Sequence, residues 1–488
     1  MLETISPRDM RSLENQIMRD SGLPSLLLME HAAQAVADTA VRMTGGNTGT
    51  VLVLCGPGNN GGDGFAAARL LIQRNVHCRI WQLSEELSPD SEKNRRILLS
   101  LYPLTECVTL LDDLPPIPAD TVLVLDALFG TGLSRPMEDM AALLCEAVNQ
   151  SGIPVLSVDI PSGLDGETGK TPGCCFIATE TVTFHRPKTG LYLGAGPDVC
   201  GKITVADIGL PREADHIPGM KILEDSELAL PPRRRRSSKG DYGRLVIIAG
   251  AMGMCGAAAV CARAALNAGA GLVTLLAPAE SVPVLQTLCP CAMAKPLTLE
   301  NTATLLASAD AAVVGPGLGR MEEWLVETVL DSGVPTLWDA DGLNALSRLP
   351  ELPLLKERDV ITPHPGEAAR LLQTEIVNVC DDPVNACRRL NELLGCVAVL
   401  KDAVSLVTDG MHWGLNNRGT PAMAKGGSGD ALAGIIGALM AQKNLPMTSF
   451  DKALLGMGLH ARAGERLAAH MGEASPTAWD LACEPFES

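Results

Sequence analysis

The sequence predicts two consecutive α/β domains, each with helices packed on a mainly parallel sheet. The chain has 488 residues, whereas a single domain usually stops growing at about 250–300 residues. In both halves, short β-rich apolar runs alternate with stretches of helical periodicity, which is typical of a parallel sheet covered by helices. The alternation lapses around residues 210–240, where prolines cluster among charged residues. We therefore expect domains at residues 1–217 and 224–488.

Four apolar runs in the N-terminal half are expected to be strands: residues 51–55, 78–82, 122–126 and 155–159. Residues 64–72, between the first two runs, have a helical period, and a long helical pattern at residues 13–40 precedes the first strand. Parallel strands need helical crossovers, so this half should form a three-layer α/β/α domain.

The C-terminal half restarts the alternation, with expected strands at residues 245–249, 272–276, 311–314, 336–338 and 397–400. The apolar stretch at residues 255–279 contains Arg263 and Asn267 and is rich in Ala and Gly, so we expect a buried helix and strand rather than a membrane span. Residues 401–405 join two apolar runs and should form a hairpin-like edge that could lie over a nucleotide.

Charge and composition exclude several classes of partner. Lys and Arg number 39 and Asp and Glu number 57, so the net charge of −18 repels nucleic acid and anionic membranes. Aromatic residues make up 3%, too few for a platform that stacks single-stranded bases. The basic run at residues 233–236 could be a phosphate or RNA patch, but we favour a solvated linker. We expect no nucleic-acid partner and no membrane partner.

The cysteines indicate a reducing compartment. There are 15 of them, an odd number, and no C-x-x-C occurs, which favours free thiols over disulfides or a cysteine-based metal site. The first residues carry an acid where a secretory signal needs basic charge, and no long apolar run follows. We expect a cytoplasmic protein. We also expect a homo-oligomer, whose number of subunits the sequence does not define.

A glycine-rich loop follows the first strand. Residues 56–64 read G-P-G-N-N-G-G-D-G and precede a helix, so bare amides at a helix N-terminus could bind a phosphate. The loop satisfies G-x-G-x-x-G, but the second strand ends in Trp81-Gln82 rather than in the acid that a dinucleotide site places there. A Walker loop is excluded because no Lys-Ser/Thr follows. The alternative is a tight structural turn.

Polar residues also end two further strands of this half. Asp126 leads into a second glycine loop, G-T-G-L-S-R-P at residues 130–136, and Asp159 leads into I-P-S-G-L-D-G at residues 160–166. Ligands of open α/β sheets bind at the carboxyl ends of the strands. Asn60, Asp126, Asp159 and Ser162 could therefore converge there, although each acid alone could be only a helix cap.

These three strings closely resemble the NAD(P)H-hydrate epimerase family over most of residues 1–215, which implies a Rossmann-like domain that interconverts (R)- and (S)-NAD(P)HX. The resemblance implies a potassium ion held by Asn60, Asp126 and Ser162, and acid–base work by Asp159 at C6 of the hydrated ring. It implies that the substrate's phosphates and ribose contact two segments: Asn59, Asn60, Gly61, Gly62 and Asp63, and Gly130, Thr131, Gly132, Leu133, Ser134, Arg135 and Pro136.

In the C-terminal half, residues 425–430 read K-G-G-S-G-D and run directly into a helical segment. The loop amides would form an anion site at the helix N-terminus. An acid beside a phosphate is repulsive, but Asp430 is well placed if it takes a proton from a hydroxyl that attacks a phosphoryl group. The alternative is an acid in the first helical turn that only stabilises the helix dipole.

Further polar motifs follow other strands of this half: G-P-G-L-G at 315–319, D-A-D-G-L-N at 339–344 and T-P-H-P-G-E at 362–367. Prolines on both sides restrict the backbone around His364, which favours substrate contact over a purely structural histidine. With G-M-C-G-A-A and G-G-S-G-D, these strings resemble the ribokinase-like superfamily, and within it the ADP-dependent NAD(P)H-hydrate dehydratases, over nearly all of residues 240–440.

That resemblance implies phosphorylation of the C6 hydroxyl of the (S)-hydrate by ADP, with Mg²⁺, followed by elimination of phosphate to restore NAD(P)H. Asp430 would be the base. The substrate would contact Ala257, Gly317, His364 and Asp430, and the nucleotide would contact Lys401, Asp402, Ala403, Val404, Ser405 and Gly429. The chain departs from the family at residues 419–424, G-T-P-A-M-A, where the family usually has G-N-x-G-M-A, and at Asp402, where glycine is common.

We therefore expect one enzyme that repairs hydrated nicotinamide cofactors, with NADHX, NADPHX and ADP as its small-molecule partners. The N-terminal epimerase would supply the (S)-hydrate that the dehydratase consumes. A vitamin or sugar kinase with a nucleotide-binding regulatory domain is the alternative, because G-x-G-D fits both. A non-catalytic NAD(P)-binding scaffold is the alternative of another class.

Overall fold

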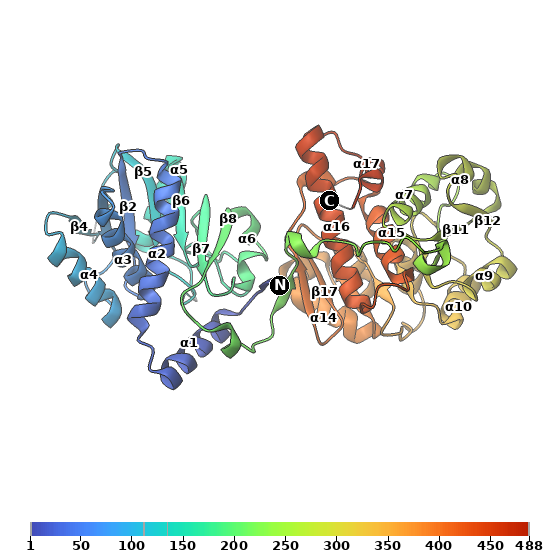
Figure 1. Cartoon of the computed structure of the whole chain (residues 1–488), viewed down its shortest axis with the longest axis horizontal. Coiled ribbons are helices and arrows are strands. Elements are labelled where there is room, and N and C mark those ends of the chain that lie inside the picture. Colours follow the sequence, from blue (N-terminus) through green and yellow to red (C-terminus); the bar gives the residue numbers. More distant parts are fainter. Residues whose placement is uncertain (1, 111–112, 134, 487–488) are drawn as a thin grey trace. The chain divides into compact units, whose positions relative to one another are not determined.

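The computed structural model describes residues 2–110, 113–133 and 135–486; Figure 1 shows its helices and strands. The chain divides into two compact units, Glu3–Met220, and Lys221 onward together with Leu2. Each unit contains a sheet with a core of parallel strands and helices packed against it. The predicted α/β class is confirmed.

The N-terminal unit contains a seven-stranded sheet in the order β4-β3-β2-β5-β6-β7-β8, in which every neighbouring pair is parallel. Its strands are β2 (Thr50–Cys55), β3 (Cys78–Gln82), β4 (Glu106–Thr109), β5 (Thr121–Ala127), β6 (Val155–Val158), β7 (Glu180–Phe184) and β8 (Lys202–Ala206). Its helices are α1 (Pro7–Ser21), α2 (Ser25–Thr44), α3 (Asn59–Gln73), α4 (Pro89–Leu101), α5 (Asp139–Ser151) and α6 (Gly196–Val199).

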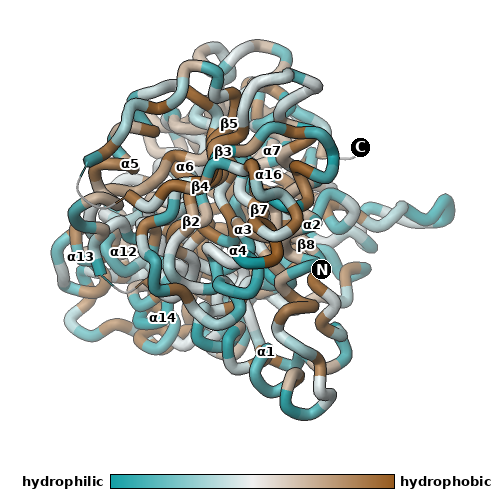
Figure 2. Tube along the Cα trace, turned by 90° about the vertical axis from the view of Figure 1, so that its left-hand side faces the viewer, coloured by the Kyte–Doolittle hydropathy of each residue, from teal (hydrophilic) through white to brown (hydrophobic). Residues whose placement is uncertain are grey.

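Helices cover both faces of this sheet because alternate residues of its strands point to opposite sides. In β2, Val51, Val53 and Cys55 belong to the core formed with α1, α2 and α3. Leu52 and Leu54 belong to a separate core formed with α5. Figure 2 shows the segments around β3 and β5 in hydrophobic colours. The unit is thus a three-layer α/β/α structure, as predicted.

Two details differ from the sequence prediction. The helical pattern at residues 13–40 forms two helices, because Gly22 adopts a left-handed conformation at φ 73° and ends α1, and Pro24 precedes α2. The strands β4, β7 and β8 were not predicted. β4 and β8 are edge strands with partly exposed residues. In β7, three of the five residues are polar (Glu180, Thr181 and Thr183), so the strand has no continuous apolar run.

The C-terminal unit is built on an eleven-stranded sheet in the order β1-β9-β18-β17-β16-β15-β14-β13-β10-β11-β12. Its strands are β1 (Leu2–Glu3), β9 (Met220–Ile222), β10 (Arg244–Ile248), β11 (Leu272–Ala277), β12 (Met293–Pro296), β13 (Ala311–Val314), β14 (Thr336–Trp338), β15 (Val360–Ile361), β16 (Val397–Leu400), β17 (Ser405–Thr408) and β18 (Trp413–Asn416).

The α-helices that accompany that sheet are α7 (Cys255–Asn267), α8 (Val282–Leu288), α9 (Leu299–Leu306), α10 (Glu323–Ser332), α11 (Asp341–Leu346), α12 (Pro365–Leu371), α13 (Ile376–Asp381), α14 (Pro383–Leu394), α15 (Ser428–Ala441), α16 (Ser449–Met471) and α17 (Ala478–Cys483). The strands from β12 to β16 pair in parallel, and β16, β17 and β18 pair antiparallel. Residues 401–405 do join a hairpin, but β17 is not at the edge of the sheet because β18, β9 and β1 extend it.

The parallel part of each sheet reverses its strand order once, and ligands of open α/β sheets bind at the carboxyl ends of the strands beside such a point. In the N-terminal unit, the reversal lies between β2 and β5. The glycine loop that starts at Gly56 follows β2, and the loop at residues 130–136 follows β5. In the C-terminal unit, β10 and β13 flank the reversal, and Ala257 and Gly317 lie in the segments that follow them.

Candidate active sites at the two switch points

The first glycine loop folds so tightly that side chains are excluded from it. A Cβ on Gly56 would lie 1.7 Å from the carbonyl oxygen of Leu128, and one on Gly61 would lie 1.9 Å from the carbonyl oxygen of Gly56. The helix α3 begins at Asn59, inside the motif, and has no side-chain cap at Gly58. Its first-turn amides are therefore available to a ligand.

Asp126 lies at the end of β5 and is fully buried. Ser162 donates its hydroxyl to Oδ1 at 2.6 Å and its backbone N–H to Oδ2 at 2.8 Å, and Ser157 donates its hydroxyl to Oδ2 at 2.9 Å. Burial raises the pKa of Asp126, while these donors oppose the rise. Among the described residues, the Asp126 carboxylate forms no ion pair, so all of its polar partners are neutral.

The side chain of Asn60 lies close to Asp159 and to Gly130, in the loop that follows the strand of Asp126. A Cβ on Gly130 would be 3.1 Å from Asn60 Oδ1 and 3.4 Å from Asp159 Oδ2, so the glycine leaves room for both side chains. The amide nitrogen of Asn60 is buried and has no hydrogen-bond partner within the part of the chain that the structure describes. Such an atom indicates a missing ligand, because buried polar groups are normally satisfied.

Asp159 follows β6 with a left-handed backbone, φ 68°, which is rare for a residue with a side chain. Its Oδ1 lies 2.6 Å from Nζ of Lys188, whose side chain is only 2% exposed. Lys188 also donates to the Phe184 carbonyl oxygen at 3.1 Å and to Thr183 Oγ1 at 3.3 Å. The pair places a carboxylate and an ammonium in contact at the carboxyl end of the sheet.

The cavity in front of this pair has a volume of about 660 Å³. Burial raises the pKa of Asp63 well above its ordinary value, and the nearby Asp159 and Glu14 raise it further. Burial also raises the pKa of Glu14, against the effect of Lys188. The polar or glycine lining comprises Arg11, Glu14, Asn15, Gly58, Asn59, Asn60, Asp63, Gly130, Thr131, Gly132, Arg135, Asp159 and Lys188.

The structure brings most of the predicted epimerase residues to this cavity. Asn59, Asn60, Asp63, Arg135, Asp159 and the segment 130–133 line it, whereas Asp126 and Ser162 lie beside it. Gly61 and Gly62 face backbone and Met29 instead, Pro136 packs near Gly173, and Ser134 lies outside the described residues.

The sequence analysis did not predict three of the charged lining residues: Arg11, Glu14 and Lys188. Lys188 follows β7, so predicting that strand would have placed it at a strand end. Arg11 and Glu14 are three residues apart on α1 and therefore share a face of that helix, but the sequence gives no signal that α1 reaches the cavity.

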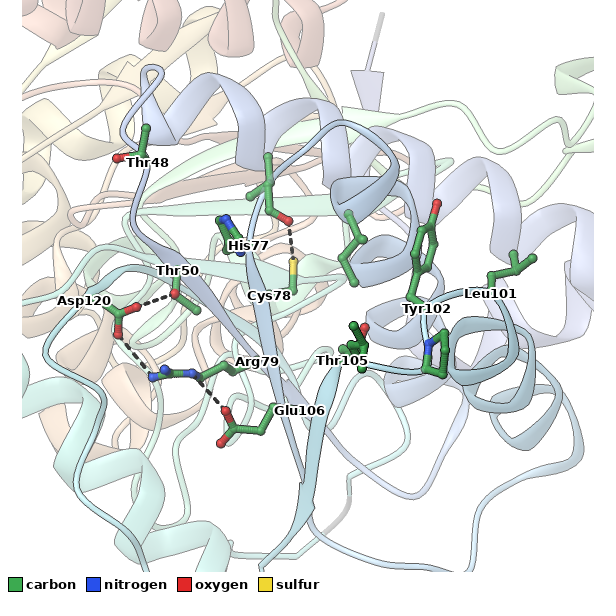
Figure 3. Close-up of a pocket in the computed structure, with 14 residues that line it drawn as sticks. Thr48, Thr50, His77, Cys78, Arg79, Leu101, Tyr102, Thr105, Glu106 and Asp120 are labelled. Carbon is green, nitrogen blue, oxygen red and sulfur yellow. Dashed lines mark hydrogen bonds and ion pairs between the residues drawn. The ribbon is translucent and has the colours of Figure 1, made fainter.

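A larger cavity, about 700 Å³, lies at the opposite end of the same sheet, where β2, β3 and β4 begin. Figure 3 shows Arg79 there between Glu106 and Asp120, at 3.1 Å and 3.2 Å. None of the predicted site residues lines it. Ligands of parallel sheets bind at the other end of the strands, so we place the site at the smaller cavity.

In the C-terminal unit, Asp430 is the third residue of α15 and is half-buried. The helix begins after Gly427, which has φ 95°, and no side chain caps it. Burial and, after it, the nearby Asp339 raise the pKa of Asp430, against the effect of Lys401, to a net value of about 7. A carboxylate with such a pKa is suited to general-base catalysis near neutral pH.

Lys401 lies beside this carboxylate, at the end of β16. Its Nζ is 2.6 Å from Oδ1 of Asp339, which is 1% exposed and also accepts from Thr362 Oγ1 at 2.9 Å. A Cβ on Gly429 would be 3.3 Å from the same Nζ. Burial lowers the pKa of Lys401, but Asp339 and Glu367 more than offset it and the pKa is raised. Lys401 is therefore a cation at neutral pH.

The segments that carry Ala257 and Gly317 meet at the switch point. Ala251 donates its N–H to the Gly317 carbonyl oxygen at 2.7 Å, and a Cβ on Gly317 would be 2.8 Å from Cβ of Ala257. At the end of the same loop, Gly319 donates its N–H to Oδ2 of Asp341 at 2.7 Å. Asp341 is one of the acids that raise the pKa of Asp430, which links this loop to the α15 terminus.

His364 is the N-cap residue of α12. Its Nδ1 accepts from the Gly366 N–H at 3.0 Å, and its own N–H donates to Glu367 Oε2 at 2.9 Å. The side chain is 54% exposed, so it remains accessible to a substrate. Residues 401–404 form the turn between β16 and β17, and Ser405, the first residue of β17, donates its Oγ to the Asp402 carbonyl oxygen at 3.1 Å. The sequence analysis did not assign Asp339, which organises Lys401.

The described residues lack two kinds of feature. They contain no group of three or more His, Cys, Asp or Glu side chains that could hold a metal ion. None of their helices combines the length and the apolarity needed to cross a membrane. All 15 cysteines are free thiols; eight are buried, five are partly buried and two are exposed.

Family models match both halves of the chain. Residues 245–484 match a model described as NAD(P)H-hydrate dehydratase, and residues 25–190 match one described as YjeF-related protein N-terminus. The two matches include every predicted site residue of both units.

Similar proteins are found among characterised sequences and solved structures. The bifunctional NAD(P)H-hydrate repair enzyme of Escherichia coli is 39% identical, over 88% of this chain and 83% of that protein. The corresponding enzyme of Moorella thermoacetica is 34% identical, over 98% and 94%. A crystal structure of ADP/ATP-dependent NAD(P)H-hydrate dehydratase from Bacillus subtilis, co-crystallized with ATP/Mg²⁺, is 26% identical, with a TM-score of 0.48, and covers 55% of this chain and 95% of that one.

Proposed function

Because this chain belongs to the family of bifunctional NAD(P)H-hydrate repair enzymes, with epimerase and dehydratase activities, we propose specific roles for its residues. The N-terminal unit interconverts (R)- and (S)-NAD(P)HX, and the C-terminal unit uses ADP to dehydrate the (S) form. Both activities serve one damaged cofactor, and the first keeps supplying the isomer that the second consumes.

In the epimerase, the hydrate's phosphates and ribose lie along the first turn of α3 and the loop at residues 130–136. The uncapped amides of α3 favour an anion, and Arg135 adds a positive charge at the cavity wall. The ring end of the substrate then faces Asp159 and Lys188. Asp159 carries out the acid–base step at C6, and the 2.6 Å contact with Lys188 keeps a proton donor and an acceptor together there.

A potassium ion fits the residues beside that cavity. Asn60, Asp126 and Ser162 offer oxygen atoms, the ligands that a hard cation prefers. The buried Asp126 carboxylate has only neutral partners among the described residues, so a monovalent cation would balance its charge. When bound, the ion would add positive charge next to the substrate's phosphates. Asn60, Asp126 and Ser162 would hold it.

In the dehydratase, Ala257, Gly317, His364 and Asp430 contact the hydrate, and Gly429 and residues 401–405 contact the nucleotide. No three-residue metal cluster exists in the part of the unit that the structure describes, so Mg²⁺ would bind mainly through the phosphates of ADP, as it does in many phosphoryl-transfer sites. Lys401 is already paired with Asp339. It would therefore present a positioned ammonium to a phosphate rather than a freely moving one.

The observation that carries the proposal is the environment of Asp430. Its pKa of about 7 lets it accept the proton of the C6 hydroxyl as that oxygen attacks the terminal phosphoryl group of ADP. AMP then leaves. The oxygen on C6 now carries the phosphoryl group; the C6–O bond then breaks with loss of a C5 proton, which forms the C5–C6 double bond of NAD(P)H and releases inorganic phosphate.

The proposal also includes the cellular location and the oligomeric state of the enzyme. We place the enzyme in the cytoplasm, which the free thiols support because a reducing compartment keeps them unpaired. A homo-oligomer also stays a prediction, to be measured by light scattering.

The test is an assay with a mixture of (R)- and (S)-hydrates and with ADP or ATP, followed at the absorbance band of reduced nicotinamide. The proposal expects nucleotide-dependent recovery of NAD(P)H. Release of a phosphorylated product without that band would instead support the vitamin or sugar kinase. Absence of both reactions would leave only a binding scaffold.

Asp430→Asn tests the base assignment directly. The amide keeps the shape and removes a charge that repels phosphate, so ADP should bind as tightly or more tightly, while dehydration falls by about 10²–10⁴-fold. Epimerisation in the other unit should be unchanged and provides the internal control. Retained turnover with weaker ADP binding would show that Asp430 only positions the helix.

A further inference from the structure

A buried histidine of α16 contacts the end of the glycine loop of the C-terminal unit, at Ser428. His460 lies in the middle of α16, is 8% exposed, and does not belong to any motif of the sequence analysis. Its Nε2 is 3.0 Å from the carbonyl oxygen of Ser428 and 3.4 Å from Ser428 Oγ. Ser428 is the first residue of α15, two positions before Asp430.

The Ser428 carbonyl oxygen defines which ring nitrogen of His460 carries a hydrogen. A carbonyl oxygen only accepts hydrogen bonds, so Nε2 must carry a proton. Burial, against the effect of the Ser428 carbonyl and together with the nearby Lys401, lowers the pKa of His460 to about 4. At neutral pH, His460 is therefore a neutral imidazole with its hydrogen on Nε2, and it donates that hydrogen to Ser428.

The segment that His460 contacts is anchored at its start by Lys425, whose Nζ donates to the carbonyl oxygens of Ala474 and Pro476 at 2.5 Å and 2.6 Å, and the Ser428 N–H donates to the Lys425 carbonyl oxygen at 3.3 Å. The residues between these contacts are glycines. Gly426 and Gly427 precede Ser428, Gly427 has φ 95°, and no side chain caps the start of α15. The first-turn amides and the Asp430 carboxylate must nevertheless be fixed with respect to each other, because a displacement of about 1 Å in a catalytic arrangement can cost about 10²-fold in rate.

On the basis of the proposed function, we propose that His460 is a positioning residue for dehydration. By donating to the Ser428 carbonyl, it holds the start of α15 so that the loop amides and the Asp430 carboxylate face the phosphoryl group together. It does not contact the substrate and it exchanges no proton during the reaction.

The experiment compares three variants of the full chain. His460→Leu removes the donor and keeps an apolar side chain, whereas His460→Gln carries an N–H close to the position of Nε2. His470→Gln, at an exposed position of the same helix, is the matched control. We expect His460→Leu to lower kcat for dehydration about 10–100-fold with little change in the KM of the hydrate. His460→Gln should recover most of this loss, and His470→Gln should match the parent.

His460→Asn covers the case in which His460→Leu does not fold, because it stays polar but is too short to reach Ser428. A purely structural role predicts a lower Tm in all three His460 variants with kcat unchanged per folded molecule, and that result would overturn the inference. So would equal losses in His460→Gln and His460→Leu. If the parent enzyme itself did not dehydrate the hydrate, the proposed function would fail instead, so the two failures are distinguishable.

Discussion

At the scale of single residues, the C-terminal site depends on the charge balance around Asp430. Burial and Asp339 raise its pKa to about 7, and the ammonium of Lys401 opposes them. The base must be ionised to accept a proton. Dehydration should therefore increase with pH through about 7 and level off above it.

Lys401→Met tests that balance. Removing the cation removes the effect that lowers the pKa of Asp430, so the inflection of the kcat profile should move to higher pH. The KM for ADP should also rise, because the positioned ammonium is lost. Lys443→Met, at a 61% exposed side chain, is the control. A shift to lower pH, or none, would contradict the assigned coupling between Lys401 and Asp430.

Asp126 carries a matching prediction in the epimerase. Asp126→Asn keeps the hydrogen-bonding shape and removes the buried negative charge, so the K⁺ concentration for half-maximal epimerisation should rise by about 10-fold or more. Exchange of K⁺ for a large organic cation should slow epimerisation by the parent enzyme and leave its dehydration rate unchanged. If epimerisation by parent and variant responds equally to K⁺, the ion is not held by Asp126.

Sequence reasoning reaches the residues that sit in glycine-rich loops at strand ends, because topology alone brings such loops together. Asn60 and Asp159 belong to this class, and Asp430 follows a glycine loop that opens a helix. It does not reach Lys188, Asp339 or His460, because each depends on a contact between elements distant in the chain. Asp339, for example, is 62 residues from Lys401.

At the scale of elements, the packing of α1 in the N-terminal unit depends on a break between α1 and α2. Gly22 ends α1 in a left-handed conformation, and its N–H donates to the Met18 carbonyl oxygen. The break lets Met10, Leu13 and Ile17 pack in the core while Arg11 and Glu14 reach the cavity. The sequence pattern did not predict this break, because the apolar period continues on both sides of it.

Gly22→Ala should destabilise the N-terminal unit by about 1 kcal/mol, because a side chain disfavours the left-handed backbone. A Cβ there would meet nothing within 4 Å, so the cost is conformational and not steric crowding. Gly22→Asn should be milder, since Asn tolerates this conformation. Thermal or denaturant unfolding measures both. Equal stability of Gly22→Ala and the parent would refute the role of the turn.

At the scale of the whole molecule, the chain consists of two units with separate sheets and separate cores. The fold class of each could be predicted from the alternation of strands and helices. The extent of the second sheet could not, because the short strands β1, β9 and β15 have two or three residues each and carry no periodic signal.

The C-terminal unit should work without the other. A fragment of residues 221–488 retains that unit's core, so it should fold and dehydrate the (S)-hydrate at a rate close to that of the full chain. It should not convert the (R)-hydrate faster than the spontaneous reaction. An insoluble fragment beside a stable full chain would show that the units depend on each other.

The most direct test of the account is the time course of NAD(P)H recovery from mixed (R)- and (S)-hydrates with ADP in excess. The parent enzyme should convert the whole mixture at the rate set by its own turnover. Asp159→Asn should give two phases: rapid recovery of the (S) fraction, then slow recovery of the rest at the spontaneous rate of epimerisation. Asp430→Asn should recover almost none. Complete conversion in one phase by Asp159→Asn, or rapid recovery by Asp430→Asn, would contradict the division of roles between the two units.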